Sequence, residues 1–119
     1  MGKRGRARAR DDKLAAPTTD YPGPDGSVLT LRGSMTPKTR AQYAATLAGS
    51  PLSQEDAWQR AVEFLFERLA VRWIVAGLAI ERQAELLGRY RMASSRERAW
   101  IRDVLRRHLT EHFPELQAP

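Results

Sequence analysis

The strongest hydrophobic pattern in the chain runs from Ser53 to Ile80. In its first half, apolar residues recur every three or four positions and polar residues occupy the opposite side, as in a helix that covers a core with one face. The second half, from Leu69 onward, is apolar on all sides except for Arg72. A helix of that composition needs cover on every side. The pattern therefore predicts a central helix around which the other segments pack.

The end of this central helix is open to two interpretations. An unbroken helix from Ser53 to Met92 would be roughly 60 Å long, at about 1.5 Å per residue, which is long for a compact chain of this size. Gly77 offers an alternative, because a glycine in the left-handed conformation can close a helix, and a second helix can begin near Ala79. No polar cap marks that second start. Both possibilities stay open.

Capping signals predict two further helices. Thr36, followed by a proline, forms a helix start, and Gly49 ends that helix. Ser94 and Glu97 form a capping box for a last helix, which runs to about residue 113 and stops at Pro114. These signals add one helix before the central pattern and one after it.

One segment, Ser27 to Arg32, has the alternation and the residue types of a strand, and Gly33 ends it. Its backbone donors and acceptors need a partner, and the simplest one is the same strand in a second copy. The fold class predicted from the pattern is therefore mainly α, with one short N-terminal strand followed by four helices. The alternative is an all-α helical bundle.

The charge of the chain is unevenly distributed. The net charge is +6, and residues 1–13 carry six basic side chains against two acidic ones. Residues 82–107 carry eight arginines against three acidic side chains. A basic arm and a basic helix are typical of a protein that binds a polyanion. A coding bias toward arginine would raise the total without any partner, but it explains the clustering less well.

Composition also divides the chain into an arm and a domain. Residues 1–26 show no periodicity and are rich in glycine and proline. Because such a segment cannot bury enough apolar surface to order itself, we predict a disordered basic arm and a turn-rich spacer there. Residues 27–119 are predicted to form a single, mostly helical domain.

The order of strand, short helix, glycine turn and capped helix resembles the ribbon-helix-helix family of DNA-binding proteins, the Arc-repressor-like group. The resemblance covers residues 27–69, and it rests on the alternating strand, on Gly49 with the cap at Ser53, and on the run from Trp58 to Glu63. Residues 70–119 exceed the family core and are predicted to be a helical C-terminal extension.

This resemblance implies a homodimer whose two strands pair into an antiparallel ribbon and enter the major groove of DNA. The outward side chains of the ribbon would contact bases, namely Val28, Thr30 and Arg32. The start of the second helix, at Ser53 and Gln54, would bind a phosphate through its free N–H groups. The arm would add phosphate contacts that do not depend on sequence, through Lys3, Arg4, Arg6, Arg8 and Arg10.

A second basic surface is predicted on the last helix. Arg98, Arg102 and Arg106 follow one another at intervals of four residues, so they share one helix face. They repel one another unless an anion lies among them. We interpret this face either as a contact for phosphate or an acidic protein partner, or as a solvated helix face.

Nothing in the sequence supports catalysis, a cofactor or a metal site. The chain has no cysteine, and its two histidines fall in an H-x-x-E-H pattern from His108 to His112. That pattern is typical of zinc peptidases, which need a further ligand far downstream, whereas only seven residues follow His112. The three tryptophans, Trp58, Trp73 and Trp100, lie on apolar helical stripes, so we expect them in the core rather than stacked on bases.

These observations predict a sequence-specific DNA-binding transcriptional regulator, of the repressor or antitoxin type, that acts as a homodimer. DNA is favoured over RNA as the ligand, and the expected location is the cytoplasm, with the nucleoid. No membrane partner is expected, because the longest apolar run is too short to span a bilayer. The alternative function is a helical protein-interaction module whose basic arm binds nucleic acid without sequence preference.

Overall fold

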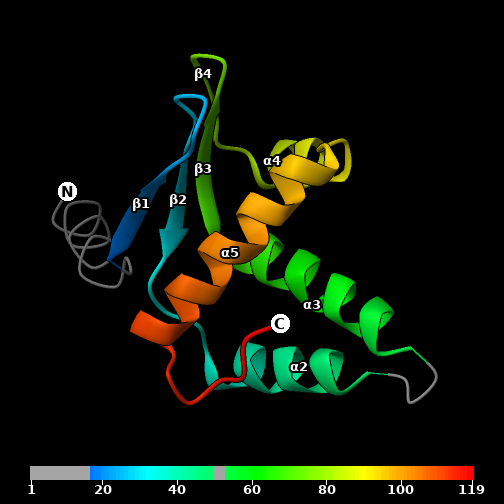
Figure 1. Ribbon diagram of the computed structural model, residues 1–119. Helices are drawn as coiled ribbons and strands as arrows, with labels where there is room; N and C mark the ends of the chain where they lie inside the picture. Colours follow the sequence, from blue (N-terminus) through cyan, green and yellow to red (C-terminus); the bar gives the residue numbers. More distant parts are fainter. Residues whose placement is uncertain (1–16, 50–52) are drawn as a thin grey trace, which may run out of the picture.

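The computed structural model describes residues 17–49 and 53–119, and over these residues it contains four helices and a four-stranded antiparallel sheet (Figure 1). The strands are β1 (Thr18–Pro22), β2 (Val28–Arg32), β3 (Ala70–Val75) and β4 (Leu78–Ile80). The helices are α2 (Pro37–Ala48), α3 (Gln54–Leu69), α4 (Gln83–Arg91) and α5 (Ser95–His112). The fold is thus α/β, and the prediction of a mainly helical domain with one strand was wrong, as was the all-α alternative.

The predicted strand is not an edge of the sheet but an inner strand. The strand order is β1-β2-β3-β4, and Leu29 of β2 pairs with Tyr21 on one side and Trp73 on the other. Because strands of the same chain occupy both of its edges, β2 has no free edge for the same strand of a second copy. This overturns the ribbon-helix-helix-like fold and the dimeric ribbon that it required.

The strand β1 lies in the segment that we predicted as a disordered spacer. Its Tyr21 is buried, at 3% exposure, on the helix-covered side of the sheet. The glycines and prolines after it form the turn into β2, in which the N–H of Gly23 donates to the oxygen of Ser27 at 2.7 Å and Gly26 has a φ of 75°. The turn-forming residues therefore end a strand here. The basic arm itself, residues 1–13, lies outside the described residues.

The apolar second half of the central pattern forms a β-hairpin. The helix α3 ends at Leu69, and β3 and β4 follow it. Between them, Ala76 and Gly77 have φ values of 51° and 80°, which fits a type I′ turn, because that turn requires positive φ at both central residues. Neither an unbroken helix to Met92 nor a new helix near Ala79 is present.

The predicted helix starts are confirmed. The side chain of Ser53 accepts a hydrogen bond from the N–H of Asp56 at 3.1 Å, and that of Thr36 accepts from Thr39. At α5, Ser94 and Glu97 form the full capping box. Each side chain satisfies an N–H group that a helix start leaves without an intrahelical partner.

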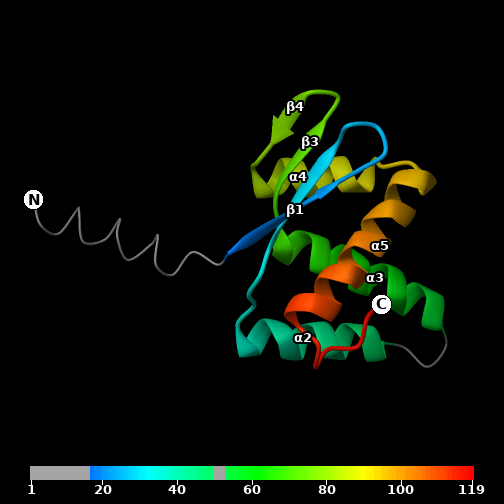
Figure 2. The same ribbon diagram turned by 60° about the vertical axis from the view of Figure 1, so that its left-hand side comes forward.

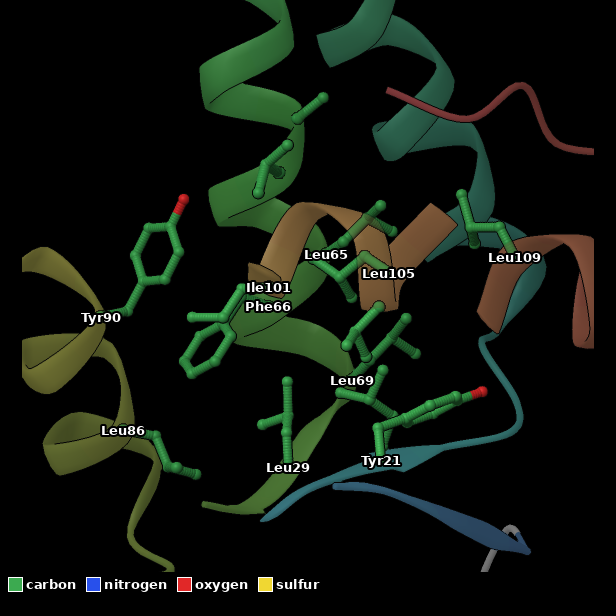
Figure 3. Packing of buried hydrophobic residues seen from close by; sticks show 14 of the residues in the cluster. Tyr21, Leu29, Leu65, Phe66, Leu69, Leu86, Tyr90, Ile101, Leu105 and Leu109 are labelled. Carbon is green, nitrogen blue, oxygen red and sulfur yellow. The ribbon is translucent and has the colours of Figure 1, made fainter. Parts of the chain in front are cut away.

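The helices α3, α4 and α5 cover one side of the sheet, and α2 packs beside α3 at one end of the molecule (Figures 1 and 2). The segment after α5 turns back along α2, where the hydroxyl of Tyr43 donates to the carbonyl of Gln117 at 2.5 Å. Figure 3 shows one core cluster shared by all these layers, with Leu65, Phe66 and Leu69 from α3, Tyr90 from α4, Ile101 and Leu105 from α5, and Tyr21 and Leu29 from the sheet. Among the described helices, none has the length and apolarity to cross a membrane.

Candidate binding groove and sheet face

A groove of about 700 Å³ lies between α3 and the first half of α5. The end of α4 contributes Tyr90 to its lining, and α3 contributes Trp58 and three carboxylates. From α5 come Arg98 and Arg102, two of the three arginines of the predicted basic face. The third, Arg106, is exposed and does not line the groove.

Both groove arginines lie over aromatic rings. The guanidinium of Arg98 is 5.3 Å from the centre of the Tyr90 ring, and that of Arg102 is 5.5 Å from the centre of the Trp58 ring. A cation at such a distance is attracted by the negative face of the ring. Tyr90 is itself fixed by the core, since its ring stacks on Phe66 at 4.9 Å. The two cations are therefore held in place before any ligand arrives.

Backbone oxygens hold the same two side chains. Arg98 donates through Nη2 to the carbonyl of Arg91 at 2.8 Å, and Arg102 donates through Nε to the oxygen of Pro119 at 3.4 Å. Each of these bonds uses one N–H group, and a guanidinium has five. Several donors of each arginine are thus left to bind an anion.

The acidic side chains across the groove have other partners. Asp56 pairs with Arg60 at 2.9 Å, and Glu63 pairs with Arg91 at 2.8 Å. In the part of the chain that the structure describes, no aspartate or glutamate side chain lies within 4.0 Å of the guanidinium of either groove arginine. The unmatched positive charge of the groove therefore lies on its α5 wall.

The prediction that Trp58 is buried in the core was wrong. We expected all three tryptophans in the core, but Trp58 is 37% exposed at the groove, while Trp73 is 1% exposed. Burial raises the pKa of the neighbouring Tyr90 hydroxyl, and the charge of Arg98 opposes part of that shift. The groove thus offers an apolar ring surface and a neutral hydroxyl beside its cations. The sequence signal for it was the arginine spacing, since the matching wall on α3 has no motif of its own.

The predicted base-contacting residues lie on the side of the sheet that the helices leave uncovered. Side chains alternate along a strand, so Val28, Thr30 and Arg32 point away from the core that holds Leu29 and Leu31. Thr30 is nevertheless only 4% exposed, and its hydroxyl donates to Oδ1 of Asp20 at 2.7 Å. We call this side the outer sheet face. Its residues are Thr18, Asp20, Pro22, Val28, Thr30, Arg32, Arg72, Ile74 and Ala79.

The predicted phosphate contacts at the start of α3 have acidic neighbours. Ser53 and Gln54 are exposed there, and the first turn also carries Glu55 and Asp56. These carboxylates already interact favourably with the positive end of the helix dipole and would repel a phosphate. The other predicted phosphate contacts, Lys3, Arg4, Arg6, Arg8 and Arg10, lie outside the described residues.

The two histidines belong to the contact between α5 and the sheet. His108 is fully buried, with Nε2 at 2.8 Å from the carbonyl of Arg32 and Nδ1 at 2.8 Å from the hydroxyl of Tyr21. The carbonyl can only accept, so Nε2 donates to it and Nδ1 accepts from Tyr21. With both ring nitrogens engaged, His108 ties α5 to β1 and β2. Among residues 17–49 and 53–119 there is no cluster of three or more side chains that could hold a metal.

Comparisons with known protein families, with curated proteins and with solved structures found no match. The geometry of the molecule is therefore the basis for inferring its function. Its described part is a small α/β domain with a charged groove between two helices and an uncovered sheet face.

Proposed function

We propose that this protein is a protein-interaction module that binds an acidic segment of a partner protein in the groove between α3 and α5. The observation that supports the proposal is the pair Arg98 and Arg102, which lie over aromatic rings and form no ion pair with an aspartate or glutamate among the described residues. The two residues are one helical turn apart, about 6 Å along the axis. Two acidic side chains one turn apart on a partner helix match that spacing.

The charge of the groove favours a polypeptide over a nucleic acid. Its lining has three cationic side chains, those of Arg60, Arg98 and Arg102, and three carboxylates, all of the latter on α3. A nucleic-acid backbone carries a negative charge at every phosphate and would face those carboxylates. A peptide can instead place its acidic side chains against α5 and neutral or basic ones against α3.

The size of the groove fits part of a partner rather than a whole domain. A volume of about 700 Å³ is within the range of roughly 300–1,000 Å³ that is usual for ligand pockets. It accommodates a few side chains of an amphipathic helix, with an apolar one on the exposed ring of Trp58. Arginine and tryptophan are also the residue types that most often dominate binding energy at interfaces.

The test uses a helical peptide of about 15 residues that carries two glutamates one turn apart beside a leucine, and a matched peptide with glutamines in their place. We expect the glutamate peptide to bind with a Kd of roughly 10–100 µM and the glutamine peptide at least about tenfold more weakly. In ¹H–¹⁵N spectra, binding should shift the indole signal of Trp58 and the Nε signals of Arg98 and Arg102.

Substitutions then locate the site. Arg98→Gln and Arg102→Gln should each weaken binding by about fivefold or more, because each removes a charge-assisted contact. Arg106→Gln is the matched control, since Arg106 belongs to the same stripe but lies outside the groove, and it should leave the Kd unchanged. Equal affinity for the two peptides, or spectral changes confined to other surfaces, would refute the proposal.

The second candidate function is that of the DNA-binding regulator predicted from the sequence. Its proposed location is the one predicted there, the cytoplasm with the nucleoid. This candidate function is supported by the six basic side chains among residues 1–13, which favour salt-dependent binding to any phosphate backbone. The two functions are compatible in one chain. In such a protein the arm would attach to nucleic acid without sequence preference, and the groove would recruit the acidic partner.

A further inference from the structure

No described helix covers the outer sheet face, because α3, α4 and α5 all lie on the other side of the sheet (Figures 1 and 2). Strand register divides it into two rows. The charged row runs across the sheet from Asp20 through Thr30 to Arg72. The apolar row runs parallel to it, through Pro22, Val28, Ile74 and Ala79.

The charged row carries opposite charges on the two sides of β2. Asp20 on β1 is negative, Arg72 on β3 is positive, and the neutral Thr30 lies between them. Because neighbouring strands are about 4.8 Å apart, the backbones of Asp20 and Arg72 are separated by roughly 10 Å. No ion pair joins these two residues within the described chain.

Arg72 also has a polar atom without a partner. Its Nε is buried and forms no hydrogen bond with any residue that the structure describes. A buried donor that is left unpaired costs free energy, so a carboxylate brought next to this guanidinium would be stabilising. Asp20 has spare acceptor capacity, since among residues 17–49 and 53–119 Thr30 is the one side chain that donates to its carboxylate.

We propose that the outer sheet face is the homodimer interface of this protein, with the sheets of two copies packed face to face around a two-fold axis parallel to β2. Such an axis places β1 of each copy opposite β3 of the other. Asp20 then faces Arg72 of the partner subunit, and the reciprocal pair forms by symmetry. Packed sheets lie about 10 Å apart, a distance that an aspartate and an arginine side chain span together.

The apolar row of the face fits this arrangement. Val28 and Ile74 are half-buried already, so contact with a second apolar row removes their remaining surface from water. The carboxylate of Asp20 lies on the edge strand β1 of this face and disfavours a phosphate backbone as the occupant. The sheet has only four short strands, so we expect a small interface and a weak, concentration-dependent dimer.

The test measures the mass of the full chain by sedimentation equilibrium over about 1–500 µM. We expect reversible association to twice the 13.5 kDa of one chain. Asp20→Arg and Arg72→Asp should each weaken the dimer by about tenfold or more, because each sets like charges opposite one another twice. The matched controls Glu85→Arg and Arg96→Asp change the same charges on exposed helical positions and should leave the Kd unchanged.

Mixing the two variants is the decisive step. Asp20→Arg in one chain faces Arg72→Asp in the other, so the mixture should form a heterodimer with a Kd within about threefold of the unmodified protein. An intramolecular role for these charges cannot produce that rescue. If Asp20→Arg fails to fold because it loses the bond to Thr30, Ile74→Lys in the apolar row serves as the second disrupting variant.

Three results would overturn the inference. The first is that the protein stays monomeric over the whole concentration range. The outer sheet face would then contact solvent or other residues of the same chain. The second is a dimer that none of the face variants weakens, which would place the interface elsewhere. The third is well-folded charge variants that stay monomeric when mixed. The inference is independent of the groove, because peptide binding to Arg98 and Arg102 involves the opposite side of the sheet.

Discussion

At the scale of single residues, His108 shows how a polar side chain can be part of the core. Burial lowers the pKa of its imidazole, and the hydrogen bond to the carbonyl of Arg32 opposes part of that shift. In the neutral form, one ring nitrogen donates and the other accepts, which is what Arg32 and Tyr21 require. Protonation would turn both nitrogens into donors and leave a buried charge. The folded protein therefore favours neutral His108.

This preference predicts a pH dependence of stability. In the unfolded chain the imidazole titrates near pH 6.5, and in the folded chain it titrates lower, so the unfolded state binds more protons between the two values. The free energy of unfolding should thus be fully retained above about pH 6.5 and fall as the pH decreases below it. Urea unfolding at a series of pH values above about 5.5 measures this, because most carboxylates stay ionised there.

Two variants assign the pH effect. His108→Asn removes the titrating group and should abolish the slope, although it also lowers stability at every pH by disturbing the bonds to Tyr21 and Arg32. His112→Asn is the matched control one helical turn away and should retain the slope. A slope that survives in His108→Asn would show that another group causes it.

At the scale of elements, the sequence predicted those features whose causes are local. The starts of the helices at Thr36, Ser53 and Ser94 follow from capping side chains within three residues of each other, so they are visible in a short window. The strand β2 was also found, together with its inward Leu29 and Leu31. What a short window cannot show is which strands lie beside it.

The other strands were missed for identifiable reasons. β1 has one buried residue, Tyr21, in a setting rich in turn-forming residues, so it lacks an apolar alternation. Apart from Arg72, β3 and β4 are apolar on both faces, since Trp73 packs inward while Ile74 lies on the outer sheet face. A continuous apolar run cannot be told from a buried helix by periodicity alone. Only the α5 wall of the groove could be predicted from the sequence, because the two walls of the groove are far apart along the chain.

The turn between β3 and β4 gives a prediction at this scale. Ala76 has a φ of 51°, and the left-handed region costs an L-residue other than glycine or asparagine roughly 1–2 kcal/mol. Ala76→Asn creates the Asn-Gly pair favoured in type I′ turns and should stabilise the protein by roughly 0.5–1 kcal/mol. Gly77→Ala should destabilise it by about 1 kcal/mol, because Gly77 also has positive φ.

Thermal unfolding measures both changes, and Ala79→Asn on β4 is the control. Residue 79 lies in a strand, where asparagine is disfavoured, so this variant should not raise the melting temperature. If Ala76→Asn unfolds at the same temperature as the unmodified protein or lower, the turn is not strained at Ala76.

At the scale of the whole molecule, the positively charged side chains fall into two groups, those of the N-terminal arm and those of the rest of the chain. Residues 14–119 contain 14 basic and 12 acidic side chains, whereas residues 1–13 contain six and two. Within the described domain, Arg40, Arg60, Arg89 and Arg91 form ion pairs, and others lie over aromatic rings. Part of the positive charge predicted for residues 82–107 is thus matched within the fold, by the ion pairs of Arg89 and Arg91. The excess charge lies mainly in the arm.

The distribution of charge predicts which residues control binding to nucleic acid. Replacing Arg4, Arg6, Arg8 and Arg10 by glutamine removes four phosphate contacts, so the affinity for a duplex of about 20 base pairs should fall by roughly tenfold or more at low salt. The slope of log K against log salt concentration should decrease in magnitude by up to about 3.6 if all four residues contact phosphates. Fluorescence anisotropy with two unrelated duplexes measures both quantities, and the duplexes should bind equally.

The groove variants supply the control for this experiment. Arg98→Gln and Arg102→Gln should leave duplex affinity nearly unchanged, because carboxylates of α3 share that groove and oppose a phosphate backbone. The arm variant should in turn leave the affinity for the glutamate peptide unchanged. If the groove variants instead abolish duplex binding while the arm variant does not, the groove is the nucleic-acid site and its assignment to an acidic protein segment is wrong.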